Sequence, residues 1–302
     1  MSSSALPLPA EGPSLKRVPA PALFVGGALS QYAGSALAVT LFAALGPARI
    51  TLLRVLIAGV VLVVVRRPRV ANWSWATVRD VLAFGAALAC MNLVFYEAIA
   101  RLPLGSAVAI EFAGPIVMAA VGSRTRRDLA ALGFAVAGVA LLADLQISGS
   151  PAGVGFALAA GAMWALYIRF GHRVANHPSL RPGDGLAVAL LFGGVLLLVP
   201  LAAQMGPALR APGLLAQAAS VAIASSVVPY ALEQVAMRRL PRARFALLLA
   251  LLPATATLMG AVILGQIPGA PEGCGVGLVV LAAALRSHRA DTAPPARGLP
   301  AA

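Results

Sequence analysis

The chain has 302 residues, of which 60% are hydrophobic and only 11% are charged, and its formal net charge is +13. A soluble domain is about a quarter charged and under about half apolar, so this composition excludes a typical soluble enzyme, a disordered chain and a coiled coil. It favours an integral membrane protein with many spans.

Residues 1–19 are rich in Ser and Pro, so we expect a short disordered tail there and a second tail at residues 287–302. Between the tails lie apolar runs, each near the ~20 residues that a helix needs to cross a bilayer. The runs fall at residues 21–44, 51–65, 80–99, 104–122, 128–144, 152–170, 185–203, 213–236, 243–264 and 270–285. The pattern predicts an all-α protein with ten transmembrane helices. A cleaved signal peptide is the alternative for the first run, but its apolar stretch exceeds the roughly 7–15 residues of a signal core.

The basic residues alternate between loops. Nearly all loop Lys and Arg residues fall on the N-terminal side of the membrane, whereas the opposite loops hold only Arg49, Arg101 and Arg210. Positive loops stay in the cytoplasm, so both termini are predicted to be cytoplasmic. The charge forms short clusters between apolar runs instead of one continuous patch, which indicates a lipid bilayer as partner and no nucleic acid.

An internal repeat divides the chain into two halves, at residues 20–145 and 150–286. Each half contains five predicted spans, and because five is odd, the second half is expected to be inverted relative to the first. Inverted repeats are typical of secondary transporters. The repeat pairs Arg101-Leu102-Pro103 with Arg239-Leu240-Pro241, and the same offset pairs Pro115 with Pro253 and Gly122 with Gly260.

Two acidic residues lie inside apolar runs and are candidates for binding substrate or a proton. Glu111 lies eight residues into its helix, roughly 12 Å deep at 1.5 Å per residue, and Pro115 frees a backbone carbonyl nearby. Glu233 lies in the eighth run on one face with Tyr230. A neutral, hydrogen-bonded Glu111 is the alternative, and Glu233 could instead snorkel or pair with an arginine.

Several polar or aromatic residues inside the runs suit either a pocket for a small amphiphilic solute or the packing of helices. They are Gln31 beside Tyr32, Asn92 with Tyr96 one turn later, and Trp164 with Tyr167. Arg54 and Glu97, by contrast, are expected near the outer surface as an ion pair or as snorkelling side chains.

Motifs for nucleotide and metal chemistry are missing from the sequence, so no cofactor, metal or catalytic residue is predicted. There is no Gly-Lys-Ser/Thr loop for ATP, no His-Glu-x-x-His helix and no Gly-x-Ser-x-Gly turn. Cys90 and Cys274 lie in apolar runs without metal or disulfide spacing. Gly273 and Gly277 form a Gly-x-x-x-Gly motif that serves either a homodimer or close packing within the chain.

The sequence resembles the drug/metabolite transporter superfamily with two EamA-type halves, and within it the threonine/homoserine exporters of bacterial inner membranes. The resemblance covers nearly the whole chain outside the tails, and the Glu-Phe-x-Gly-Pro motif is its most specific part. The segments that carry it are residues 92–96, 102–105, 107–115, 164–168, 229–233 and 239–241.

The resemblance implies ten helices, a central cavity between the halves and proton-linked efflux of small amino acids across the inner membrane. The expected function is therefore a secondary exporter and not an enzyme. Export of another metabolite or a drug is the first alternative, and an intramembrane lipid-modifying enzyme is the second. The chain departs from the exporters at Leu252 and Gln266, where an acidic residue is usual.

Overall fold

The computed structural model describes residues 18–121, 125–147, 150–181, 183–206, 210–240 and 248–287. The two predicted tails therefore lie outside the described residues, apart from the positions next to the first and last helices, and so do Gly122 and Pro241 of the repeat.

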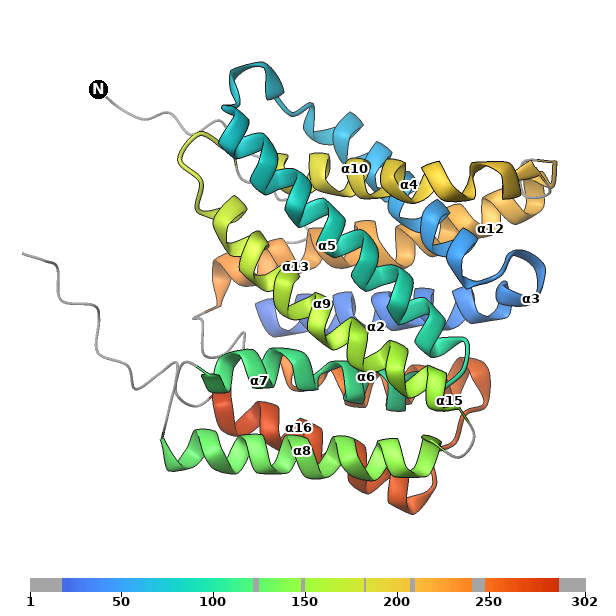
Figure 1. The fold of residues 1–302 in the computed structure, drawn as a ribbon, viewed down its shortest axis with the longest axis vertical. Coiled ribbons are helices and arrows are strands. Elements are labelled where there is room, and N and C mark those ends of the chain that lie inside the picture. The colour runs from blue at the N-terminus through green and yellow to red at the C-terminus, as the bar shows by residue number, and fades with distance from the viewer. Residues whose placement is uncertain are drawn as a thin grey trace, which may run out of the picture.

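All secondary structure in the described ranges is helical, which confirms the predicted all-α class (Figure 1). The first part of the chain forms α2 (Ala20–Thr40), α3 (Phe42–Leu45), α4 (Pro47–Arg66), η1 (Val70–Asn72), α5 (Trp75–Ile99), α6 (Leu104–Glu111), α7 (Ala113–Val121) and α8 (Arg126–Ile147). The second part forms α9 (Pro151–Ala175), α10 (Asp184–Leu201), η2 (Ala202–Gln204), α12 (Pro212–Ala222), η3 (Ile223–Val227), α13 (Val228–Arg239), α15 (Leu252–Leu264) and α16 (Ala270–Ser287).

Six helical segments are long and apolar enough to cross a membrane among the residues that the structure describes: Ala20–Thr40, Pro47–Arg66, Trp75–Ile99, Pro151–Ala175, Asp184–Gln204 and Pro212–Glu233. Four shorter apolar helices accompany them, at Leu104–Val117, Leu129–Ala143, Leu252–Leu264 and Ala270–Leu285. By length and composition, these six candidate spans and the shorter helices are typical of a multi-pass membrane protein.

Local sequence signals set where the long helices begin. The hydroxyl of Ser74 accepts a hydrogen bond from Thr77 N at 3.2 Å and caps α5, and Ser150 caps α9 in the same way through Gly153 N. α4 starts with Pro47 directly after Gly46, which has φ 74°. Proline suits the first turn of a helix because the backbone N–H groups of that turn have no acceptor within the helix, so the N–H that proline lacks is not missed.

Prolines also interrupt two helices near their middle. Pro115 has no N–H to donate to the carbonyl of Glu111, and the helix divides there into α6 and α7. Pro229 follows η3, a π-helical turn that separates α12 from α13. Such interruptions leave backbone carbonyls free inside a membrane protein, where another chain segment must satisfy them.

Helices distant in the sequence pack together in pairs. α5 packs along α9, α2 along α13, α4 along α10, α6 along α15 and α8 along α16, so each pair joins a helix before residue 148 with one after residue 150. Figure 1 shows α8 beside α16 at the lower end of the view and α9 running beside α5. The core is therefore shared between the two parts of the chain.

Two glycines bring α7 and α9 to backbone contact. A Cβ atom at Gly114 of α7 would lie 2.0 Å from the carbonyl oxygen of Gly161 of α9. A Cβ at Gly161 would lie 2.6 Å from the carbonyl oxygen of Glu111. Small residues let membrane helices approach to backbone contact, so α9 lies directly against the break between α6 and α7.

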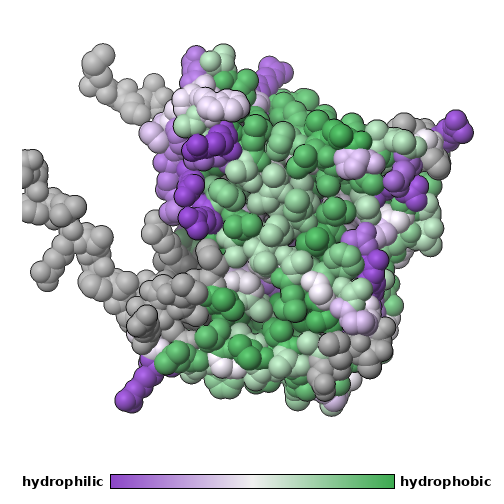
Figure 2. Space-filling view, in the orientation of Figure 1, coloured by the Kyte–Doolittle hydropathy of each residue, from purple (hydrophilic) through white to green (hydrophobic). Residues whose placement is uncertain are grey.

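The surface separates apolar from polar residues. Figure 2 shows apolar side chains across the middle of this face and hydrophilic ones gathered at its left and right margins. Hydrogen bonds join chain segments at one end of the helices: Arg181 Nη2 donates to the carbonyl oxygen of Arg67, and the hydroxyl of Thr77 in the first turn of α5 lies 3.1 Å from His177 Nε2. An apolar band between polar margins is the arrangement that a bilayer requires.

Candidate functional site

Glu111 is the last residue of α6 and is buried, with 8% of its surface exposed. Its carboxyl makes no hydrogen bond and no ion pair to any described residue. The next residue, Phe112, packs edge-on against Trp164 of α9 with ring centroids 5.1 Å apart. The break at Pro115 and the glycine contact with α9 therefore lie beside a buried carboxyl that has no partner among the described residues.

Arg54 is buried between helices, so the predicted snorkelling of its side chain is wrong. Only 5% of this residue on α4 is exposed. Its Nε donates to the Ser226 hydroxyl at 2.9 Å, and its Nη2 donates to the Ser225 carbonyl oxygen at 3.0 Å. The guanidinium also lies 5.0 Å from the ring centroid of Tyr96. The turn before Pro229 supplies the hydrogen-bond acceptors that let an arginine be buried here.

Glu97, predicted as the partner of Arg54, pairs with Arg101 instead. Arg101 Nη1 lies 2.5 Å from the Glu97 carboxylate across one turn of helix. Arg101 also lies over the ring of Phe156 on α9, 4.9 Å from its centroid. This pair is partly exposed at the end of α5, where an ion pair contributes little stability.

Five buried or half-buried side chains come together around Arg54 and Glu111. We call Tyr32, Arg54, Glu111, Tyr230 and Glu233 the central polar cluster. Tyr32 lies within electrostatic range of Glu111, Glu233 and Arg54. Tyr230 lies within electrostatic range of Arg54 and Glu233. Glu111 in turn lies within electrostatic range of Arg54. The cluster draws one residue each from α2, α4 and α6 and two from α13. One cation and two carboxyls thus share an otherwise apolar interior.

Asn92 and Tyr96 of α5 are both buried, but they differ in their hydrogen bonding. Asn92 Nδ2 donates to the Leu88 carbonyl oxygen of its own helix at 2.8 Å. The Tyr96 hydroxyl is the one buried side-chain polar atom in the described ranges without a hydrogen-bond partner. A buried hydroxyl without a hydrogen-bond partner costs stability. The ring of this tyrosine lies against the guanidinium of Arg54, so the hydroxyl is carried by a residue beside the central polar cluster.

The other predicted site residues lie at different distances from this cluster. Tyr167 is within electrostatic range of Tyr230 and Glu233, and its ring packs on Phe84 with centroids 5.0 Å apart. Trp164 does not belong to the central polar cluster, but its ring packs on Phe112, the residue next to Glu111. Gln31 is half-buried on α2 and makes no hydrogen bond to a described residue, so nothing in the described ranges links it to the central polar cluster.

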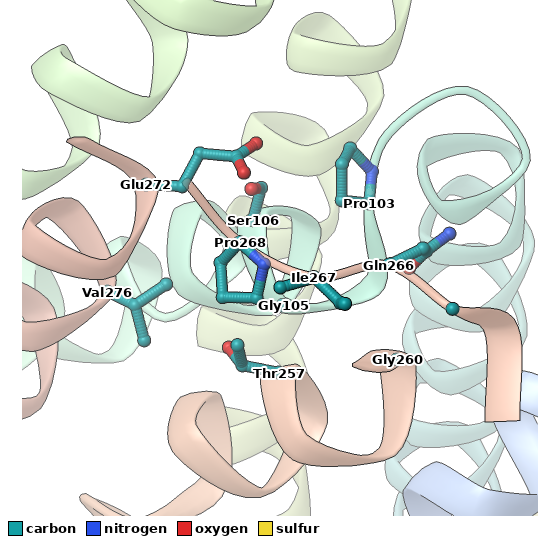
Figure 3. A pocket seen from close by; sticks show the side chains of 11 residues that line it. Pro103, Gly105, Ser106, Thr257, Gly260, Gln266, Ile267, Pro268, Glu272 and Val276 are labelled. Atoms are coloured by element: carbon teal, nitrogen blue, oxygen red, sulfur yellow. The ribbon is translucent and has the colours of Figure 1, made fainter. Parts of the chain in front are cut away.

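A separate pocket of about 220 Å³ lies where α6 begins and α15 ends (Figure 3). Its lining includes Ser106, Thr257, Gln266 and Glu272. Gln146 Nε2 donates to one oxygen of Glu272 at 2.7 Å, and Gly269 N donates to the other at 3.1 Å. Both Glu272 oxygens therefore accept hydrogen bonds, whereas the carboxyls of the central polar cluster make none to the part of the chain that the structure describes.

Neither a metal site nor a disulfide occurs in the part of the chain that the structure describes. No group of three His, Cys, Asp or Glu residues there could hold a metal ion. Cys90 and Cys274 are free and exposed. Gly273 and Gly277 have no atom within 4 Å of an added Cβ, whereas Gly275 packs on Gly138 and Leu142 of α8. The Gly-x-x-x-Gly motif is therefore not the contact between α16 and α8.

Comparisons with known proteins give the family. The model of the EamA-like transporter family matches residues 151–287. The threonine/homoserine exporter RhtA of Escherichia coli K12 is 36% identical over 77% of this chain and 79% of its own, and that of Salmonella typhimurium LT2 is 35% identical over the same shares. The chain belongs to the EamA-like transporter family. A solved crystal structure of another protein shares the fold, with a TM-score of 0.58 at 20% identity, over 90% of this chain and 98% of that one.

Family membership makes this protein a transporter. The structure also shows what surrounds Leu252 and Gln266, the two positions at which the sequence departs from the exporters that it resembles. Leu252 begins α15 and is buried in the apolar core. Gln266 Oε1 accepts a hydrogen bond at 2.9 Å from Leu104 N, the first amide of α6. First-turn amides have no partner within their helix, so Gln266 serves as a cap that ties α15 to α6.

Sequence reasoning missed Arg54 as a site residue, together with Ser225 and Ser226. One signal was present: the two adjacent serines stand just before Pro229 inside an apolar run, where a proline frees carbonyls and polar side chains need partners. Nothing in the sequence says that Arg54, 171 residues away from Ser225, is that partner.

Proposed function

We propose that this chain is a secondary-active exporter of small amino acids, of the threonine and homoserine type, in the bacterial inner membrane. The observation that carries the proposal is the 36% identity to the RhtA exporter over most of both chains. The central polar cluster supports it, because charged groups inside a membrane protein mark substrate and proton paths. Its substrate is a small molecule, and transport needs no cofactor.

Glu111 and Glu233 are the proposed acceptors for the ammonium group of the substrate or for a proton. Glu111 is buried and Glu233 is half-buried, and neither carboxyl has a hydrogen-bond partner among the described residues. A carboxyl that receives a proton from one side and releases it when an ammonium arrives couples the two fluxes. Asn92, Tyr96, Trp164, Tyr167, Tyr230 and Gln31 are the proposed lining of the path.

We also propose that the protein has ten spans in two inverted halves, at residues 20–145 and 150–286, with short cytoplasmic tails. The pairing of helices supports this, because exchange of the two halves maps the pairs onto one another. The exchange turns the α5–α9 pair into the α13–α2 pair. It leaves three other pairs unchanged: α4–α10, α6–α15 and α8–α16. A homodimer through the open face at Gly273 and Gly277 stays a prediction.

The topology makes a direct prediction about reporter fusions. A cytoplasmic reporter is expected to be active after Arg67, Arg181 and Ser287, and a periplasmic reporter after Arg101 and Ile267, because positive loops stay inside. Activity of the periplasmic reporter after Ser287 contradicts an even number of spans.

Export itself is tested in cells that lack their own threonine exporters. Expression of this protein is expected to restore growth on inhibitory threonine and homoserine and to increase efflux from loaded cells. Collapse of the proton gradient with ATP maintained is expected to slow this efflux, since the chain has no phosphate-binding loop. Unchanged tolerance and efflux contradict the proposed substrates, and efflux that ignores the gradient contradicts proton coupling alone.

A further inference from the structure

Arg54 is a buried cation without an ion pair to any described carboxylate. Burial of an unpaired charge is costly, so a protein that keeps one in its interior has an anion for it to meet. Glu111 lies within electrostatic range of Arg54 but makes no ion pair with it. No contact ion pair with a described residue therefore neutralises the guanidinium charge.

The position of Arg54 is fixed by the turn that precedes Pro229. Ser30 donates to the Ala224 carbonyl oxygen at 2.7 Å, and Arg54 takes the Ser225 carbonyl. A Cβ at Gly34 would lie 2.7 Å from Ser225 N, so α2 holds this turn at backbone contact. π-Helical turns are frequent at functional sites, and here one orients a cation.

Part of the guanidinium remains unused. Nε and Nη2 make the two hydrogen bonds to the serines, whereas Nη1 has none within the described ranges. A guanidinium presents five N–H donors in a planar fork that suits a carboxylate. Tyr96, with its unpartnered hydroxyl, lies against the same group. A donor set of this kind recognises a carboxylate.

We propose that Arg54 binds the carboxylate of the transported solute while Glu111 binds its ammonium group. The interior then carries opposite charges for the two ends of one small zwitterion. The site selects α-amino acids over amines and amino amides of the same size. This inference rests on the proposed export of amino acids and adds the residue that recognises their acid group.

The alternative role for Arg54 is compensation of the charge of Glu111 with no contact to substrate. The two roles differ in selectivity. A compensating charge is replaced by any cation, so Arg54→Lys would keep the full wild-type preference, whereas a carboxylate-binding fork is lost at least in part when lysine replaces arginine.

The test uses the full chain in liposomes loaded with radiolabelled L-threonine, with L-threonine and L-threoninamide as competitors. For the wild type, the amide is expected to compete about tenfold or more weakly, the effect of one charged hydrogen bond. In Arg54→Gln, the apparent affinity for threonine is expected to fall by about tenfold to a hundredfold while that for the amide changes little, so that the preference disappears. Arg54→Lys keeps the charge without the fork and is expected to lie between them.

Arg49→Gln is the matched control, because Arg49 lies on the same helix but bonds to Gln204 at its end. This variant is expected to keep the wild-type preference. A wild type without preference, or an Arg54→Gln variant that keeps it, overturns the inference while amino-acid export stands. If Arg54→Gln does not fold, the wild-type preference and the Arg54→Lys variant decide. A wild type that transports no amino acid overturns the proposed function instead, and the inference with it.

Discussion

Replacement of Glu111 by glutamine is expected to abolish export while the protein stays folded and inserted in the membrane. Glutamine keeps the shape and the hydrogen-bonding capacity of the side chain. It cannot take up or release a proton, and it has no negative charge with which to form an ion pair with an ammonium group. Glu111 has no hydrogen bond to a described residue that this change could break. A rate loss of about a hundredfold, which corresponds to about 2.7 kcal/mol of barrier, is expected in efflux assays at equal expression.

The pH dependence of export separates this role from a structural one. A carboxyl that carries the coupled proton makes the rate depend on pH, and the amide removes that dependence, so residual efflux by Glu111→Gln is expected to be flat across neutral pH. Glu97→Gln is the control, because Glu97 pairs with Arg101 at a partly exposed helix end. Its effect is expected to be mild. Near-normal efflux by Glu111→Gln decides for a packing role of this residue.

Substitution of alanine for Gly161 is expected to disrupt the packing around the site. The new Cβ would lie 2.6 Å from the Glu111 carbonyl oxygen and 3.3 Å from Gly114 N. Both neighbours are backbone atoms, so no rotamer change relieves the contact, and α9 must move away from α6 and α7. Overpacking of this kind costs about 1–3 kcal/mol or more. A lower melting temperature and loss of transport are expected.

Gly155→Ala on the same helix is the matched control for this substitution. An added Cβ at Gly155 has no atom within 4 Å. Alanine is a better helix former than glycine by about 1 kcal/mol, so this variant is expected to be as stable as the wild type or more stable. Equal melting temperatures for the Gly161→Ala and Gly155→Ala proteins are incompatible with backbone contact between α9 and α6.

The sequence by itself determined the membrane class, the approximate positions of the apolar helices and the free carbonyl before Pro115, whereas the division of the predicted span at residues 104–122 into α6 and α7 came from the structure. These features are local: an apolar run of sufficient length must form a helix in a bilayer, and a proline must free a carbonyl. The burial of Glu111 followed for the same reason, since it stands in the middle of such a run. The Glu-Phe-x-Gly-Pro motif further identified the family, which similarity over most of the chain confirms.

Only the tertiary structure decided which residues meet. Arg54 and Glu97 looked equivalent in the sequence, yet Arg54 lies buried against Ser225 and Ser226 while Glu97 pairs at a helix end. Helices that are apolar all round carry no periodic signal for the face that packs inward. Their partners are chosen by the fit of small residues, such as Gly114 on Gly161, and by carbonyls that a distant side chain must satisfy. The central polar cluster therefore arises from packing between helices of both parts of the chain, which no single run of sequence specifies.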